Sequence, residues 1–409
     1  MKRAGIAISS CFALLVSACN SDRPEIVDRA AIARLPWENV VRLARGSAVT
    51  WRMWRGDPSI NAYIDHWVVP RLARDYGISL RAVEGQGPEI VNQLVVEREA
   101  RARGVADLVW INGETFHNLR KAGLLWGPWA GRLPNAAALD STSPIVMRDF
   151  EQPLDGWESP WGRVQFAFIY DTVRTRDPPH SFAELKVWIK KHPGRFTHDQ
   201  QFTGVAFQTA LMYSLSGGAG KFEGGFRPAL YKAASARVFG WLEDVLPDFW
   251  RAGRDYPLGV AEMHRLFANN EIDFTMSYNQ NEVVTKIRQG VLPPTAHALV
   301  VTDGTLANAH YVGIPFNAPN PPGAMVVANF LLSPEAQYEK LRAEVWGDGT
   351  VLDVAKLTSE WRSRFESLRM DSHAVPPAEL TRHAVPEAAP EYRERLADDW
   401  KRLVRDRAR

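Results

Sequence analysis

The sequence predicts an α/β fold of two lobes, in which one lobe is interrupted by the insertion of the other. Short apolar segments alternate with amphipathic segments between residues 47 and 129, an order typical of a parallel sheet with right-handed crossovers. A second alternating block begins at residue 163, and apolar strand-like segments of the first kind return after residue 296. The length of 409 residues is sufficient for two such blocks.

Three strand–helix units make up the first block. Segments 48–54 and 78–83 have the patterns of strands, and segments 59–76 and 88–103 have helical spacing, with Pro70 at a kink or break. The third unit has a buried strand at 107–111, Asn112 as helix N-cap, and a helix ending at Gly123. Ligands of open α/β sheets lie beyond the carboxyl ends of the strands, which makes residues 112–114 candidates. The alternative is an ordinary βα unit without a ligand.

The second block contains a strand at 163–170, a helix capped by Ser181, helices at 202–216 and 231–250, and a strand at 272–277 followed by a helix at 281–290. Segments 163–170 and 297–303 pass between the blocks, so we expect a hinge with a ligand cleft beside it. We therefore divide the chain into lobe 1 (47–162 with 297–345), lobe 2 (163–296) and a C-terminal helical segment (346–409) that packs on the lobes.

The N-terminal residues have the composition of a secretory signal. Lys2 and Arg3 precede an apolar run at 6–16, and residues 16–19 (VSAC) resemble a bacterial lipobox. We expect residues 1–18 to be a lipoprotein signal peptide, Cys19 to carry lipid, and residues 19–46 to form a tether and a first helix. The alternative is a plain secretory signal in which Cys19 is incidental. The expected location is the periplasmic or cell-surface face of a bacterial membrane, with lipid as the only membrane attachment.

Composition argues against several other functions. A formal net charge of +2 does not indicate nucleic-acid binding. The ten histidines are scattered without a metal-binding pattern, and no G-x-S-x-G nucleophile motif is present. The glycine-rich segment 216–225 lacks the spacing of a phosphate-binding loop. We therefore expect no metal, no cofactor and no catalytic residue.

Five segments together carry a family resemblance: residues 51–65, 107–129, 156–171, 192–207 and 308–321. On these segments the chain resembles the extracellular solute-binding proteins of ABC importers, within the two-lobe periplasmic-binding class of type II, and in particular the YnjB-like branch. The resemblance implies an interlobe ligand cleft with two crossing strands, a small-molecule ligand, and an ABC permease with a cytoplasmic ATPase as partner. It also implies a monomer that is not an enzyme.

In this class the cleft is built from strand-end loops of both lobes. The residues at such positions are Trp54, Gly56, Asp57, Asn112, Glu114, Trp161, Thr203, Tyr278, Asn279 and Asn308. Each has a competing interpretation, because a tryptophan at a strand end is often buried in the core and Asp57 precedes a helix that it would cap. Aromatic and acidic residues favour an organic cation or a heteroaromatic compound. Asparagines with tryptophans would suit a sugar, and Arg55 with a helix N-terminus would suit an anion.

Two other functions fit an exported lipoprotein with such a cleft. Asp57 and Glu114 on neighbouring strand ends would suit the carboxylate pair of a hydrolase acting on glycans. A ligand-sensing lipoprotein would use the same cleft with a different partner. No catalytic motif supports the hydrolase, so the solute-binding function is preferred.

Overall fold

The computed structural model of the protein describes residues 29–406. The expected signal peptide and Cys19 lie outside the described residues. Within residues 29–406, no helix has both the length and the apolar character needed to cross a membrane.

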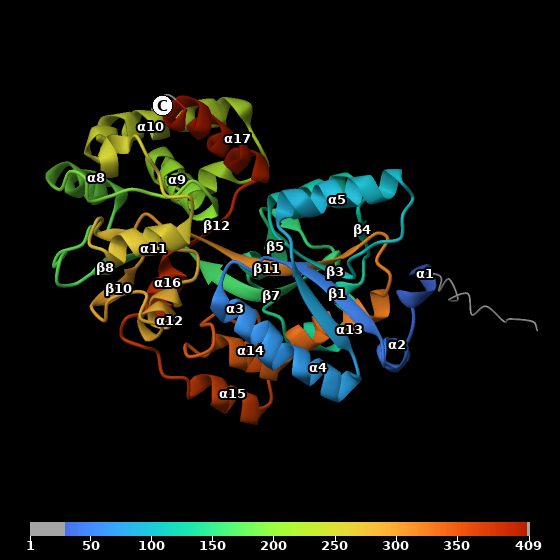
Figure 1. Cartoon of the computed structure of the whole chain (residues 1–409). Helices are drawn as coiled ribbons and strands as arrows, with labels where there is room; N and C mark the ends of the chain where they lie inside the picture. Colours follow the sequence, from blue (N-terminus) through green and yellow to red (C-terminus); the bar gives the residue numbers. More distant parts are fainter. Residues whose placement is uncertain (1–28, 407–409) are drawn as a thin grey trace, which may run out of the picture.

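Two separate hydrophobic cores organise the chain. The larger core is built from residues 32–161 and 309–365, and the smaller one from residues 166–306 and 374–404. We call the parts around these cores lobe 1 and lobe 2. Figure 1 shows them side by side, joined by strands that run from one to the other. The predicted α/β fold of two lobes with crossing strands is confirmed.

Lobe 1 is built on a mixed sheet in the order β12-β11-β3-β1-β2. Its strands are β1 (Ala48–Met53), β2 (Ser79–Glu84), β3 (Leu108–Ile111), β4 (Leu125–Trp126), β7 (Glu158–Gln165), β11 (Thr305–Pro315) and β12 (Ala384–Pro386), beside a small hairpin of β5 (Arg148–Asp149) and β6 (Gln152–Pro153). Strands β1, β2 and β3 are parallel, as predicted, whereas β11 is antiparallel to β3.

Helices cover both faces of this sheet. They are α1 (Arg29–Ile32), α2 (Trp37–Ala44), α3 (Pro58–Ala62), α4 (Val69–Tyr76), α5 (Gly87–Glu99), α6 (Glu114–Lys121), α7 (Pro144–Met147), α13 (Pro321–Leu331), α14 (Pro334–Leu341) and α15 (Ser359–Glu366). A π-helical turn, Tyr63–Val68, joins α3 to α4. In Figure 1, α5 lies on one face of the sheet, and α4 and α13 lie on the other. Because successive crossovers lie on opposite faces, the sheet is doubly wound and its strand ends open toward lobe 2.

Lobe 2 has a three-stranded antiparallel sheet in the order β10-β8-β9. Its strands are β8 (Ala167–Asp171), β9 (Phe274–Ser277) and β10 (Ala296–Leu299), and its helices are α8 (Phe182–Lys191), α9 (Phe202–Ser216), α10 (Pro228–Val245), α11 (Val260–Ala268), α12 (Glu282–Arg288), α16 (Pro377–His383) and α17 (Pro390–Trp400). Helix α9 is buried along most of its length, which fits its uniformly apolar sequence.

The chain crosses between the cores three times, at residues 161–166, 306–309 and 365–374. Gln165 bonds the crossing strands together: its side-chain amide donates to Thr305 Oγ1 at 2.9 Å and to the Leu380 carbonyl at 3.0 Å. Strands β7 and β11 pair along the crossing and form one ribbon between the lobes, and β12 pairs with the other side of β11 at residues 305–307.

The structure differs from the expected domain division at residues 297–306 and adds a strand from the tail. Residues 297–306 belong with the lobe 2 core, not with lobe 1, because β10 pairs with β8 and Leu306 packs in the second core. The tail was expected to pack on the lobes, but it also adds β12 to the sheet and makes the third crossing. A strand this short has no periodicity to reveal it.

Candidate functional site

A cleft of about 700 Å³ lies between the lobes. Nine of the ten predicted ligand-binding residues line it: Trp54, Gly56, Asp57, Asn112, Glu114, Thr203, Tyr278, Asn279 and Asn308. A volume of this size accommodates a small organic molecule. The structure thus brings together residues from both lobes that are far apart in the sequence.

Trp161 is the exception, and the expectation that it lines the cleft is wrong. Its side chain is 0% exposed and its ring packs edge-on against Trp51 and Trp110, at centroid distances of 5.3 and 4.9 Å. The competing interpretation, a core tryptophan, describes it correctly. Trp110 and Trp346 contribute the aromatic surface instead, since both line the cleft.

The lobe 1 wall begins with the loop after β1. Asp57 caps α3 by accepting from the backbone N–H groups of Ser59 and Ile60, at 2.7 and 3.3 Å. Trp54 is 36% exposed, and its indole lies directly over Gly56, where a Cβ would come within 2.6 Å of the ring. Glycine at this position therefore lets the indole lie flat on the loop as one wall of the cleft.

The loop after β3 differs from the expectation in one detail. Asn112 lines the cleft but does not cap α6, because the N-cap is Gly113, at φ +50°. The Gly113 N–H donates to the buried carboxylate of Asp149 at 2.5 Å, and a Cβ here would strike the Phe150 ring. This bond fixes the first turn of α6, so that Glu114 lines the cleft.

The lobe 2 wall is formed largely by the segment from β9 into α12. Ser277 donates to Glu282, and the Nε2 atom of His264 lies 3.4 Å from Glu282 Oε1. Burial alone would raise the pKa of Glu282, but His264, Lys286 and Ser277 outweigh it and hold that pKa at about 2. Glu282 is therefore an anion that fixes the orientation of its neighbours.

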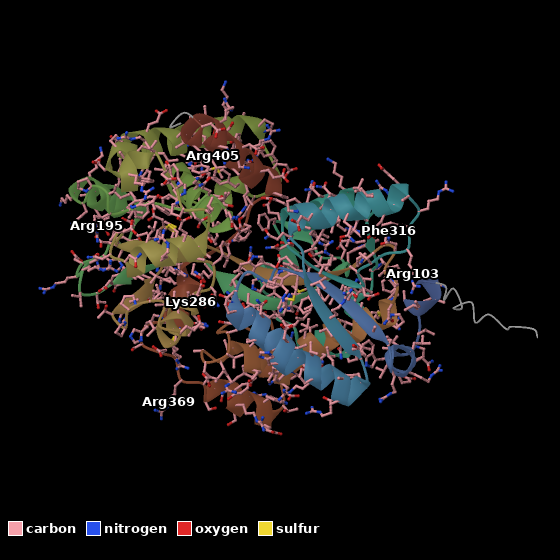
Figure 2. All side chains as sticks on the ribbon, in the orientation of Figure 1. Arg103, Arg195, Lys286, Phe316, Arg369 and Arg405 are labelled. Carbon is pink, nitrogen blue, oxygen red and sulfur yellow. The ribbon has the colours of Figure 1, made fainter. Side chains whose placement is uncertain are left out.

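An ion pair joins the lobes across the cleft. Lys286 Nζ donates to Asp57 Oδ2 at 2.6 Å, with side-chain exposures of 9% and 14% respectively. Beside it, the Gln289 amide donates to Ser59 Oγ at 2.9 Å. Figure 2 labels Lys286 in the region where α12 approaches α3. Since the partners belong to different lobes, these contacts exist only when the lobes are together.

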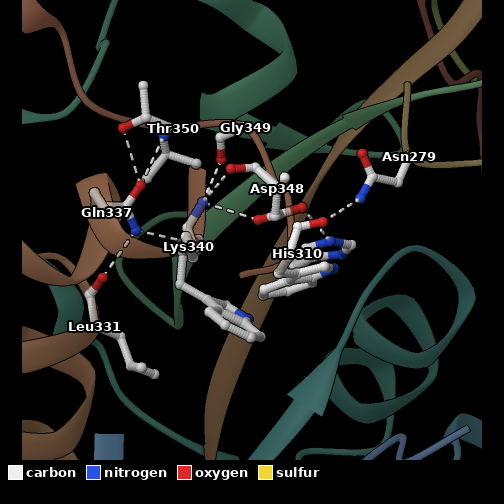
Figure 3. A network of polar contacts seen from close by, with 12 residues as sticks. Asn279, His310, Leu331, Gln337, Lys340, Asp348, Gly349 and Thr350 are labelled. Carbon is white, nitrogen blue, oxygen red and sulfur yellow. Dashed lines mark hydrogen bonds and ion pairs between the residues drawn. The ribbon is translucent and has the colours of Figure 1, made fainter. Parts of the chain in front are cut away.

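A polar network forms the floor of the cleft near the crossing strands (Figure 3). Lys340, fully buried, donates to Asp348 Oδ2 at 2.8 Å, and Asp348 Oδ1 lies 3.1 Å from His310 Nε2. The His310 ring stacks on Trp346, with centroids 5.8 Å apart and planes at 13°. The Asn279 amide of lobe 2 donates to the Trp346 carbonyl at 3.4 Å.

A group of acidic residues around one arginine lies beside the cleft, and two of its carboxylates, Glu114 and Asp199, line it. Sequence reasoning found Glu114 and missed the other members. Arg393 of α17 bonds Glu387 at 3.2 Å and lies 3.6 Å from Glu114 Oε1. Asp199 also lines the cleft and is 1% exposed. We call Glu114, Asp199, Glu387 and Arg393 the acidic corner. Arg393 comes from the C-terminal tail, and its position depends on the third crossing.

Metal binding receives no support from the side-chain arrangement. In the part of the chain that the structure describes, no group of three or more His, Cys, Asp or Glu residues is placed to hold a metal ion.

Comparison with known proteins places these features in context. Residues 67–366 match the family model described as "Bacterial extracellular solute-binding protein". The chain is also 35% identical over 353 residues to Protein YnjB of Escherichia coli (strain K12), a match that covers 85% of this chain and 90% of YnjB.

Solved structures of low sequence identity share the fold. The periplasmic binding protein AfuA from Actinobacillus pleuropneumoniae, with fructose-6-phosphate bound, has a TM-score of 0.61 at 14% identity, covering 88% of this chain and 98% of AfuA. A putative spermidine/putrescine ABC transporter protein from Listeria monocytogenes has a TM-score of 0.60 at 17% identity, covering 87% and 99%. Iron-bound HitA from Pseudomonas aeruginosa has a TM-score of 0.59 at 16% identity, covering 86% and 99%. The fold is therefore that of the two-lobe periplasmic binding proteins.

Proposed function

Because the chain belongs to the family of bacterial extracellular solute-binding proteins, we propose that it is the substrate-binding lipoprotein of an ABC importer. It captures a small polar solute in the interlobe cleft and delivers it to a membrane permease driven by a cytoplasmic ATPase. Export and a lipid at Cys19 keep it next to that permease, and it works as a monomer. The lipobox-like residues 16–19 support this location.

One observation carries the proposal: the cleft has walls from both lobes and is spanned by the ion pair between Asp57 and Lys286. A ligand in such a cleft adds contacts to both walls at once, so it favours the form in which the lobes are together. Nine residues predicted from the sequence line this cleft, and we propose that they contact the ligand.

The fold does not identify the solute. Structures of the same fold are named for a sugar phosphate, for polyamines and for iron. Their ligands must be distinguished by side chains in the cleft, not by the architecture.

The hydrolase alternative receives no specific support. Asp57 caps a helix and bonds Lys286, and Glu114 lies beside Arg393. Both carboxylates thus have roles that require no reaction.

The test combines stabilisation and compaction of the exported chain, residues 20–409. A ligand at 100 times its dissociation constant stabilises a protein by about 2.7 kcal/mol, which raises the unfolding temperature by several degrees. We expect a small-molecule extract of cells to produce this rise and to reduce the radius of gyration in solution scattering. An extract that produced neither effect would contradict the solute-binding role.

Membrane attachment is tested separately. The full-length protein should fractionate with membranes, and a Cys19→Ser variant should be released from them. Membrane retention of the variant would refute the lipid anchor and leave the binding role intact.

A further inference from the structure

The acidic corner carries more negative charge than its arginine balances. Arg393 is the cation in contact with Glu114 and Glu387, at 3.6 and 3.2 Å, and Asp199 lies close enough to feel its charge. Burial raises the pKa of Glu114, of Asp199 and of Glu387, and Arg393 opposes this rise only in part. Three carboxyl groups around one cation leave this end of the cleft short of positive charge.

One carboxylate oxygen of Asp199 has no hydrogen-bond donor among the described residues. Its Oδ1 atom accepts from the N–H groups of Gln201 and Gly204, at 2.7 and 3.2 Å. Its Oδ2 atom is buried and has no hydrogen-bond partner among residues 29–406. A buried carboxylate oxygen without a donor is costly, and Asp199 lines the cleft, so a solute that brings a donor to this oxygen would remove that cost.

Aromatic rings lie next to this corner. Phe202 is 40% exposed, its ring is edge-on to Tyr278 at 4.9 Å, and the Arg393 guanidinium covers it at 3.9 Å. Trp54 presents its indole to the cleft from the other lobe. Flat apolar surfaces of this kind bind rings and alkyl chains, and their faces attract cations.

Within residues 29–406, the cleft offers few free cationic side chains to an anion. Its histidines, His264 and His310, each lie beside a carboxylate, 3.4 Å from Glu282 and 3.1 Å from Asp348 respectively. None of the described residues that line it is an arginine, and its lysine, Lys286, already bonds Asp57 and lies 3.7 Å from Glu282. The N-termini of α5, α9 and α11 also line the cleft, but a phosphate or a carboxylate that approached them would meet the carboxylates of the acidic corner. A neutral sugar would leave the charge imbalance of the acidic corner unchanged.

We propose that the solute of this cleft is an organic cation with at least one N–H donor, whose charged end lies against Glu114 and Asp199 and whose apolar body lies on Phe202 and Trp54. This inference rests on the proposed solute-binding function and specifies its ligand class. The N–H group of the solute donates to Asp199 Oδ2. Its positive charge, together with that of Arg393, offsets the negative charges of the three carboxylates. Charge-assisted bonds of this kind are about twice as strong as neutral ones.

The experiment separates the ligand class from the binding role. A small-molecule extract of yeast is divided by cation exchange into a cation fraction and a flow-through, and each is added to residues 20–409 in a thermal unfolding assay. We expect the cation fraction alone to raise the unfolding temperature. Stabilisation by the flow-through alone would overturn the cation class while leaving the binding role standing. Stabilisation by neither fraction would overturn both.

Two variants test whether the cation binds in the acidic corner. Glu114→Gln keeps the shape of the side chain and should weaken binding of the active cation fraction at least tenfold. The matched control is Glu99→Gln, which removes a carboxylate from the exposed end of α5 and should change nothing. Equal affinity of wild type and Glu114→Gln would overturn the placement of the cation in the acidic corner.

Discussion

Replacing Lys286 by Met should separate the two lobes. At 2.6 Å, the attraction between Lys286 and Asp57 is about 6 kcal/mol at an effective dielectric constant of 20. Desolvation and lost side-chain freedom offset most of this, and hydrogen bonds to charged groups contribute about 1.5–3 kcal/mol net. Because the bond exists only with the lobes together, its loss should lower the ratio of closed to open protein by about 10- to 150-fold.

The assay is a distance distribution between two spin labels. The chain has two cysteines, Cys11 and Cys19, so residues 20–409 are free of thiols and labels at Val96→Cys and Val187→Cys are unambiguous. These residues are 63% and 54% exposed and lie on α5 and α8, one in each lobe. Met at residue 286 should shift the distribution toward longer distances.

Controls isolate the ion pair from general destabilisation. Lys191→Met removes an exposed lysine of lobe 2 and should leave the distribution unchanged. Asp57→Asn keeps an acceptor to cap α3 while it removes the charge, and combined with Lys286→Met it completes a double-mutant cycle. A coupling energy below about 0.5 kcal/mol in that cycle would refute the reasoning.

Three further predictions follow from charges at and below the cleft. Burial raises the pKa of Glu114 and of Asp199, so these carboxyls take up protons at a higher pH than ordinary carboxyls near 4, and a bound cation needs them ionised. The affinity for the cation should therefore fall as the pH is lowered, beginning above the ordinary carboxyl range; calorimetry showing constant affinity would argue against their contact with the cation. The pKa of Glu282 falls from 4.5 to about 2 on folding, so its ionised form contributes about 3 kcal/mol to the free energy of unfolding above pH 4.5, and this contribution is lost toward pH 2. In urea unfolding at several pH values, Glu282→Gln should lack this pH-dependent contribution. Identical pH profiles of stability for the wild type and the variant would contradict the prediction. Lys340→Met leaves the carboxylate of Asp348 buried without its lysine partner and should lower the free energy of unfolding by about 3–5 kcal/mol in the same assay. The double variant Lys340→Met/Asp348→Asn should recover part of this loss. An unchanged urea midpoint for the single variant would show that the ion pair is not needed for stability.

The first three strands were predictable because their signals are local. Apolar segments, helical spacing and the cap at Asp57 each depend on a few neighbouring residues, and the structure has these elements in place. The direction of β11 was not predictable in this way. A strand pairs according to what lies beside it in space, and β11 meets β3 at residues at least 200 positions apart in the chain.

Site residues could be predicted where their position at a strand end is enough to place them in the cleft. They could not be predicted where the direction of the side chain determines whether it faces the cleft or the core. Strand-end loops meet at one edge of a sheet, so Asp57 and Glu114 were found. Trp161 was misplaced because every residue of β7 except one is buried, which leaves no alternation to show which face points to the cleft. Lys286 was missed because a lysine four residues after a glutamate on a helix usually forms an exposed ion pair.

The ribbon of β7 and β11 limits how the two lobes can move relative to one another. Two separate linkers would let one lobe swing and also roll relative to the other. The two crossing strands β7 and β11 are hydrogen-bonded side by side, with Gln165 holding Thr305 and the Leu380 carbonyl, and they resist roll because it would shear their bonds. The remaining freedom is bending of the ribbon across its width, a rotation about a single axis. Rotation about a single axis would return Lys286 along the same path to Asp57 and keep the two walls of the cleft in register.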